Sequence, residues 1–244
     1  MSLVLYGLLA FVSLVSSIIA TFFGVAGGSI LFLTLTFLFS SKVAIPIHGV
    51  VQFLNNGIRS SVFRKHISWN TVFFYGILSL PGALLGGELY DVFSNDILEV
   101  SIAITIIITN HLPGIRFSKR DKLSIISLGF LSSFLGMIVG VTGPILTSFF
   151  TAKGFEKENL IGTKSMCQVI TQLSKSIVFF KLLNVDFELY SVSISIIMAF
   201  SIIGILFTKR VLHQIEASRH KKYVKMILDA VAFVMIINVL ISNM

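Results

Sequence analysis

One stretch of the sequence carries polar and cationic side chains inside an otherwise apolar run. They recur at intervals that place them on one face of a helix. The members of this first stripe are His48, Gln52, Asn55, Asn56 and Arg59. Ionisable groups within a membrane helix face the protein interior or water, and by default they suggest a functional site.

A second stripe of the same kind follows 116 residues later. Its members are Lys164, Gln168, Thr171, Gln172 and Lys175. Neither apolar run contains a carboxylate. Cations, amides and free backbone N–H groups suit an anion with several acceptor oxygens, whereas a metal cation would need carboxylates or carbonyls. The two stripes therefore predict a site for a small anion and no metal site.

Two structural explanations compete with anion binding. Amides also join neighbouring helices by hydrogen bonds, and long cationic side chains can extend along apolar surface to reach water. The amides fit binding and packing equally well. For Arg59 and Lys175 we favour a functional role, as ligands or as charges at the mouths of a pathway. Arg59 lies near one end of its run and Lys175 near the opposite end of its own.

The composition places these stripes in a membrane protein. Of 244 residues, 55% are hydrophobic and only 12% are charged, about half the charged fraction of soluble domains. The mean hydropathy is +0.94. This composition excludes a nucleic-acid-binding or disordered chain. The net charge of +8 comes mainly from short gaps between apolar runs, where a membrane protein needs basic residues. The single cysteine, Cys167, excludes an intramolecular disulfide, and no zinc-ligand spacing occurs.

Ten apolar runs follow one another along the chain. They are Leu3–Phe23, Ser29–Phe39, Pro46–Phe63, Trp69–Tyr90, Ile97–Leu112, Leu123–Val139, Ile145–Ala152, Asn159–Phe180, Phe187–Phe207 and Val224–Ile241. The second and seventh are too short to span a bilayer, which needs about 20 residues. Each follows a glycine-rich break, Gly24–Gly28 or Gly140–Pro144. Because the peptide groups at such a break cannot face lipid, they must be buried in protein or line a wet cavity.

These breaks reveal an internal duplication. An offset of 116 residues superposes the two breaks and also aligns Gln52 with Gln168 and Arg59 with Lys175. We therefore expect two membrane repeats, residues 1–115 and 116–244, in one all-α transporter domain. Four residues at the breaks complete the predicted substrate site. They are Gly27, Gly28, Thr142 and Gly143.

The loop charges predict how the chain crosses the membrane. Lys and Arg concentrate in the gaps at 64–68, 113–122, 153–158 and 208–225, which are therefore placed on the cytoplasmic side. Each broken segment then begins and ends on one side, as a re-entrant hairpin. With one hairpin and three crossings per half, the halves have opposite orientation and both termini lie outside. Inverted repeats with broken helices are typical of secondary transporters with a midplane site.

Three features resemble those of a known family. They are the duplicated break, the polar helix after each break, and the turn leading to Ser68-Trp69, which recurs as Val185-Asp186. In these features nearly the whole chain resembles the TauE/SafE sulfite exporter family, also called the 4-toluene sulfonate uptake family. Ala26, Leu33–Leu35 and Pro144 depart from the family's glycine and proline pattern, which affects the expected substrate more than the fold. The resemblance implies export of small anions such as sulfite, organosulfonates or carboxylates across the inner membrane.

Three other functions stay open at this point: an anion channel, an integral-membrane enzyme and a scaffold without transport. No nucleophile–base set and no phosphate-binding loop is present, so we expect neither catalysis nor direct ATP coupling. The expected partners are the anion, membrane lipids and protons as coupling ion, with Glu88 and Asp229 as candidate proton carriers. Glu88 fits better as a solvated residue near the outer end of its helix, and Asp229 as an interfacial acid paired with Lys225. No cofactor and no nucleic acid is expected, and the sequence leaves a homo-oligomer open.

Overall fold

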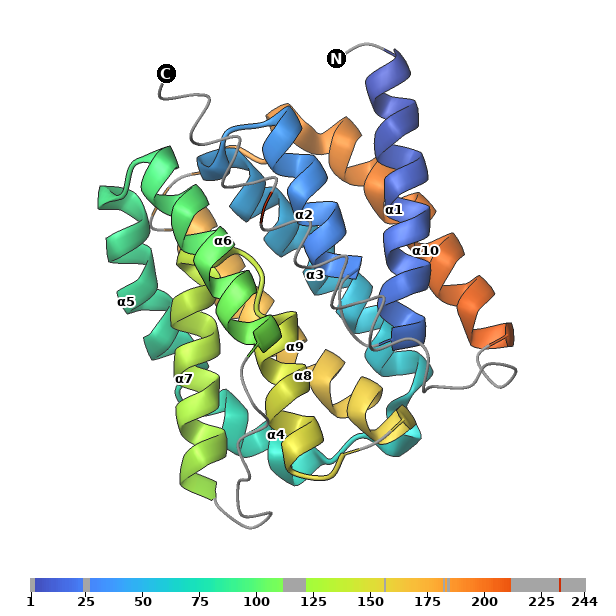
Figure 1. The fold of residues 1–244 in the computed structure, drawn as a ribbon, viewed down its shortest axis with the longest axis vertical. Helices are drawn as coiled ribbons and strands as arrows, with labels where there is room; N and C mark the ends of the chain where they lie inside the picture. Colours follow the sequence, from blue (N-terminus) through green and yellow to red (C-terminus); the bar gives the residue numbers. More distant parts are fainter. Residues whose placement is uncertain are drawn as a thin grey trace.

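A computed structural model describes residues 3–23, 27–111, 122–155, 157–181, 183, 185–211 and 233. Throughout these ranges the regular elements are helices, and no strand occurs (Figure 1). The elements are α1 (Leu3–Phe23), α2 (Gly27–Leu38), α3 (Ser41–Val62), η1 (Arg64–His66), α4 (Trp69–Gly76), α5 (Ser79–Val92), α6 (Asn95–His111), α7 (Lys122–Val139), α8 (Gly143–Ala152), α9 (Lys157–Lys181), η2 (Glu188–Tyr190) and α10 (Ser191–Val211).

Most of the predicted runs appear as helices, and one of them is divided by a bend. The run Trp69–Tyr90 forms two helices, α4 and α5, which meet at an angle of 43°. Pro81 has no N–H group, so the carbonyl of Ile77 lacks its helical partner and the chain bends there. The predicted run Val224–Ile241 and the candidate proton carrier Asp229 lie outside the described residues.

Several helices have the length and composition of membrane spans. Within the described ranges, three are long and apolar enough to cross a bilayer, and the bent pair α4–α5 makes a fourth if it is one span. Large apolar side chains on their outer faces, such as Phe11, Phe73 and Ile203, are more than half exposed. In contrast, α2 has 12 residues and α8 has 10, so they reach about 18 Å and 15 Å and cannot span.

The two polar helices, α3 and α9, pack side by side in the middle of the molecule. Around them the helices of the two halves exchange partners, since α1 packs along α10 and α7 packs along α5. Glycines allow this close packing: a Cβ atom at Gly82 or Gly86 would lie within 2.5 Å of an α7 carbonyl. In Figure 1, α1 runs downward from the N-terminus, whereas α7 starts at the lower end and runs upward.

The helix bounds repeat at the offset found in the sequence. Phe23 and Val139, which are 116 residues apart, end the first helix of each hairpin. Gly27 and Gly143, separated by the same number, start the second. These bounds agree with a duplication, while the division into two inverted repeats stays a prediction.

The start of α3 depends on a contact that compensates for a proline. Pro46 lies inside the helix and cannot donate a hydrogen bond to the carbonyl of Lys42. The hydroxyl of Tyr90, from α5, donates to that carbonyl instead, at 2.5 Å. The side chain of Asn95 accepts a hydrogen bond from the N–H of Lys42 at 3.1 Å. Residues from the α5–α6 corner therefore fix the entry of the polar helix.

We expect Tyr90→Phe to lower the free energy of unfolding by about 1 kcal/mol, because a buried carbonyl loses its partner. The measurement is unfolding in mixed micelles of increasing denaturing-detergent fraction. Tyr190→Phe is the matched control, since its ring packs on Phe39 and no hydroxyl bond is shown for it. Equal stability of the two variants would contradict the account of this corner.

Candidate functional site

A small cavity of about 30 Å³ lies between the two hairpin tips and the two polar helices. That volume accommodates about two water molecules. The cavity is lined by Ala20, Gly28, Ser29, His48, Gln52, Asn56, Arg59, Val141, Thr142, Gly143, Pro144, Lys164, Gln168 and Gln172. Both predicted stripes and both glycine-rich breaks therefore contribute to one site.

Two short helices begin at this cavity. Gly28 is the second residue of α2, and Gly143 is the first residue of α8. The first N–H groups of a helix have no partner within it, and the helix dipole makes this end attractive to anions. Pro144 suits the first turn of α8, where a missing N–H group costs nothing. The sequence thus brings two helix N-termini to one place.

Two cations line the cavity without a buried acid to balance them. Arg59 is 4% exposed and Lys164 is 5% exposed. Across the described ranges, no Asp or Glu is among the buried residues. The Lys164 ammonium donates to the hydroxyl of Thr147 at 3.2 Å. The Arg59 guanidinium donates to Asn56 Oδ1 at 2.8 Å and to Thr21 Oγ1 at 3.3 Å. The partners shown for both cations are neutral, so a net positive charge faces the cavity.

Several other polar atoms in the cavity wall lack a hydrogen-bond partner. They are Ser29 Oγ, His48 Nδ1, Asn56 Nδ2, Thr142 Oγ1 and Gln172 Oε1. Buried polar groups in folded proteins are almost always hydrogen-bonded, so five unpartnered atoms in one cavity indicate a place for a polar ligand or water. The hydroxyls of Ser29 and Thr142 and the amide N–H group of Asn56 can donate to the oxygens of an anion, whereas Gln172 Oε1 is an acceptor.

His48 connects the first hairpin tip to α3. Its Nε2 atom lies 3.0 Å from the carbonyl oxygen of Gly28 and 3.2 Å from Gln52 Nε2. One ring nitrogen cannot donate and accept at once, so protonated Nε2 donates to Gly28 and leaves the Gln52 amide free for another partner.

Four predicted site residues lie outside this cavity lining. Lys175 donates to the carbonyl of Gly140 at 3.3 Å, at the end of α7, where a cation also interacts favourably with the helix dipole. The Thr171 hydroxyl pairs with that of Tyr75 at 2.6 Å. Asn55 is buried but does not line the cavity, and Gly27 faces α1. Their role as substrate ligands stays a prediction.

The structure adds residues that the sequence did not indicate. Ser29 follows the first break, lines the cavity and has a buried hydroxyl group without a partner. Its position next to Gly28 is the feature of the sequence that could have predicted this role. Thr147 holds Lys164 across the gap between α8 and α9. No spacing rule predicts the contact between Thr147 and Lys164, because it depends on how α8 is rotated about its axis.

Glu88, a candidate proton carrier, is exposed on α5, as expected for a solvated residue.

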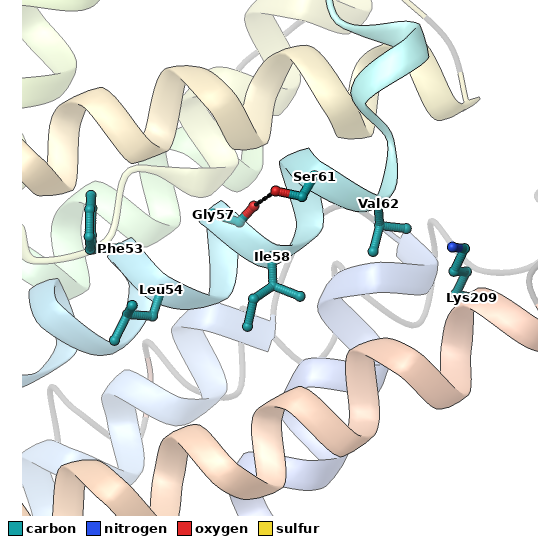
Figure 2. A pocket seen from close by; sticks show the side chains of 7 residues that line it. All are labelled: Phe53, Leu54, Gly57, Ile58, Ser61, Val62 and Lys209. Atoms are coloured by element: carbon teal, nitrogen blue, oxygen red, sulfur yellow. Dashed lines mark hydrogen bonds between the residues drawn. The ribbon is translucent and has the colours of Figure 1, made fainter.

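A second hollow, a groove of about 460 Å³, lies on the opposite face of α3 (Figure 2). It is lined by Phe53, Leu54, Gly57, Ile58, Ser61, Val62 and Lys209. Its wall is mostly apolar, and a single cation from the end of α10 stands at one end. The groove brings together none of the donors of the central cavity, so the central cavity is the candidate substrate site.

Comparison with known proteins identifies the family of this chain. A family model described as sulfite exporter TauE/SafE matches residues 9–239. The chain belongs to this family. It is also 29% identical over 164 residues to a protein of Methanocaldococcus jannaschii described as a probable membrane transporter protein. This match covers 59% of the present chain and 60% of the length of the relative. No solved structure matches. Family membership, the relative and the apolar helices together identify a membrane transporter.

The two hairpin tips differ in what a larger side chain would meet. A Cβ atom at Gly27 would lie 1.9 Å from the Ser16 carbonyl of α1, whereas one at Gly143 would meet Gln168 Nε2 at 3.5 Å, an ordinary contact. We expect Gly27→Leu to prevent folding and Gly143→Leu to fold and fill the cavity. Gel filtration after detergent extraction measures the difference.

A monodisperse Gly27→Leu protein would contradict the close packing of α1 and α2. Gly57→Leu is the control, since a Cβ atom there meets nothing within 4 Å.

Proposed function

We propose that this protein is a secondary transporter that exports small anions, such as sulfite, organosulfonates or related carboxylates, by alternating access around the central cavity. The observation that carries the proposal is the pair of buried cations, Arg59 and Lys164, facing a cavity with no buried acid in the described part of the chain. A buried charge without a counter-ion is costly, and a bound anion removes that cost.

The donor set around the cations favours an anion with several oxygens. Amides from both stripes, Gln52 and Gln168, line the cavity together with the hydroxyls of Ser29 and Thr142. Such groups can each donate to one oxygen while the cations neutralise the charge. Because the cavity has about 30 Å³, the conformation described here is closed around the site, and a compact anion needs the least opening.

The helical arrangement supports alternating access. The two hairpins run in opposite directions, and each packs on a helix of the other half. Broken helices whose ends meet at one site, in halves of opposite direction, are the architecture of many secondary transporters. Movement of one hairpin with its partner helix would open the cavity to one side.

The charges at the helix ends support an orientation. Basic residues that the structure describes follow α3, start α7 and end α10: Arg64, Lys65, Lys122, Lys209 and Arg210. The side chain of Asn159 donates to the His66 carbonyl at 2.8 Å, which joins the start of α9 to the same end. By the positive-inside rule this end faces the cytoplasm.

The test is purified protein in liposomes, with flux and binding measured for sulfite, sulfate, thiosulfate, sulfonates and small carboxylates. A transporter shows saturable flux at its substrate's binding affinity, whereas a channel shows flux that rises linearly with concentration. Absence of both flux and binding for every anion would overturn the proposal.

We expect Lys164→Met to weaken binding of the transported anion about ten- to a hundredfold, because a charge-assisted hydrogen bond is lost. Lys181→Met is the matched control, since it removes the same charge from an exposed position at the end of the same helix. Isothermal titration gives both affinities. Equal loss in the two variants would mean that only overall charge matters.

A further inference from the structure

One residue of the central cavity presents an acceptor among the donors. Gln172 lines the cavity, and within the described part of the chain its Oε1 atom is buried without a hydrogen-bond partner. An amide oxygen can only accept a hydrogen bond, and a buried acceptor without a partner is rare in folded proteins. We infer that Gln172 recognises a hydroxyl group on the transported anion, so that the substrate is a monoanion with one O–H donor. The inference rests on the proposed transport function and deepens it.

The equivalent amide in α3 shows the opposite arrangement. The offset of 116 residues places Asn56 on Gln172 and Arg59 on Lys175. The Arg59 guanidinium donates to Asn56 Oδ1 at 2.8 Å, so the oxygen of that amide is occupied. Its nitrogen, Nδ2, is the atom that lacks a partner among the described residues. Asn56 therefore has a donor to offer to a ligand, whereas Gln172 has an acceptor.

The oxygen of Gln172 is left free because the neighbouring cation is directed elsewhere. Lys175, which follows Gln172 by three residues on α9, donates to the carbonyl of Gly140 at 3.3 Å. A Cβ atom at Gly49 would lie 3.6 Å from Gln172 Oε1, so the oxygen faces a position of α3 that has no side chain. The acceptor thus lies between the two polar helices, opposite a residue that has no side chain to donate to it.

The cations and the acceptor together define the class of ligand. Arg59 and Lys164 match oxygens that carry negative charge, whereas Gln172 Oε1 repels an oxygen without a hydrogen atom. Hydrogen sulfite, a hydroxylated sulfonate and a hydroxycarboxylate each have both kinds of oxygen. Sulfate and unsubstituted alkyl sulfonates have acceptor oxygens alone. A site that is built to bind a hydroxyl group discriminates against analogues that lack it.

The experiment compares anions of equal charge and nearly equal size that differ by a hydroxyl and a methyl group. The pairs are 2-hydroxyethanesulfonate with 1-propanesulfonate, and glycolate with propionate. Isothermal titration of the purified full-length protein gives the affinities at one pH. We expect the hydroxylated member of at least one pair to bind about tenfold more tightly, because it alone donates to Gln172.

A substitution assigns this preference to the residue. Gln172→Met keeps the length of the side chain and removes the acceptor, so the two members of the pair should then bind within about twofold of each other. Gln168→Met is the matched control on α9. A Cβ atom at Gly143 would lie 3.5 Å from Gln168 Nε2, so this amide presents a donor to the second hairpin tip. Its loss should weaken both members alike and leave their ratio unchanged.

Equal affinity of the wild-type protein for both members of both pairs would overturn the inference, and would mean that water alone satisfies Gln172. This comparison needs no variant, so it holds even if Gln172→Met fails to fold. A preference that persists in folded Gln172→Met would overturn the assignment to this residue. Absence of binding for every anion would instead reject the proposed function itself, so the two failures are distinguishable.

Discussion

The structure depends on positive charge that is buried without negative charge. Arg59 and Lys164 face one cavity, and the described helices bury no acid to match them. Isolated buried cations destabilise a fold, so neutral groups must hold them: the Asn56 amide and the hydroxyls of Thr21 and Thr147. Such partners reduce the cost and still leave the charge for an anion.

The ends of the broken helices add further positive potential at the cavity. The N-termini of α2 and α8 meet at the cavity, where their dipoles add to the cations, while Lys175 binds the carbonyl end of α7 at Gly140. Cations therefore serve two purposes here. Some face the central cavity, and one stabilises the helix end beside it. The helices of the two halves exchange partners around the site, α1 with α10 and α7 with α5.

Much of the fold could be predicted from the sequence, because hydropathy and glycine-rich breaks determine where membrane helices begin and end. The bounds of α1 and α7 agree closely with the predicted runs. Hydropathy does not show the bend between α4 and α5, because the bend comes from the N–H group that Pro81 lacks. For the site, the spacing of polar residues shows which of them share a helix face. It does not show how that helix is rotated toward its neighbours. Gly27 and Gly28 are adjacent, yet one packs on α1 and the other lines the cavity.

The most direct test locates the anion. A crystal structure with selenite, the selenium analogue of sulfite, would show the ion by its anomalous scattering. The account predicts one strong peak between Arg59 and Lys164, within hydrogen-bond distance of the N-termini of α2 and α8. A peak only at surface cations such as Lys209, with the central cavity filled by water alone, would contradict the account.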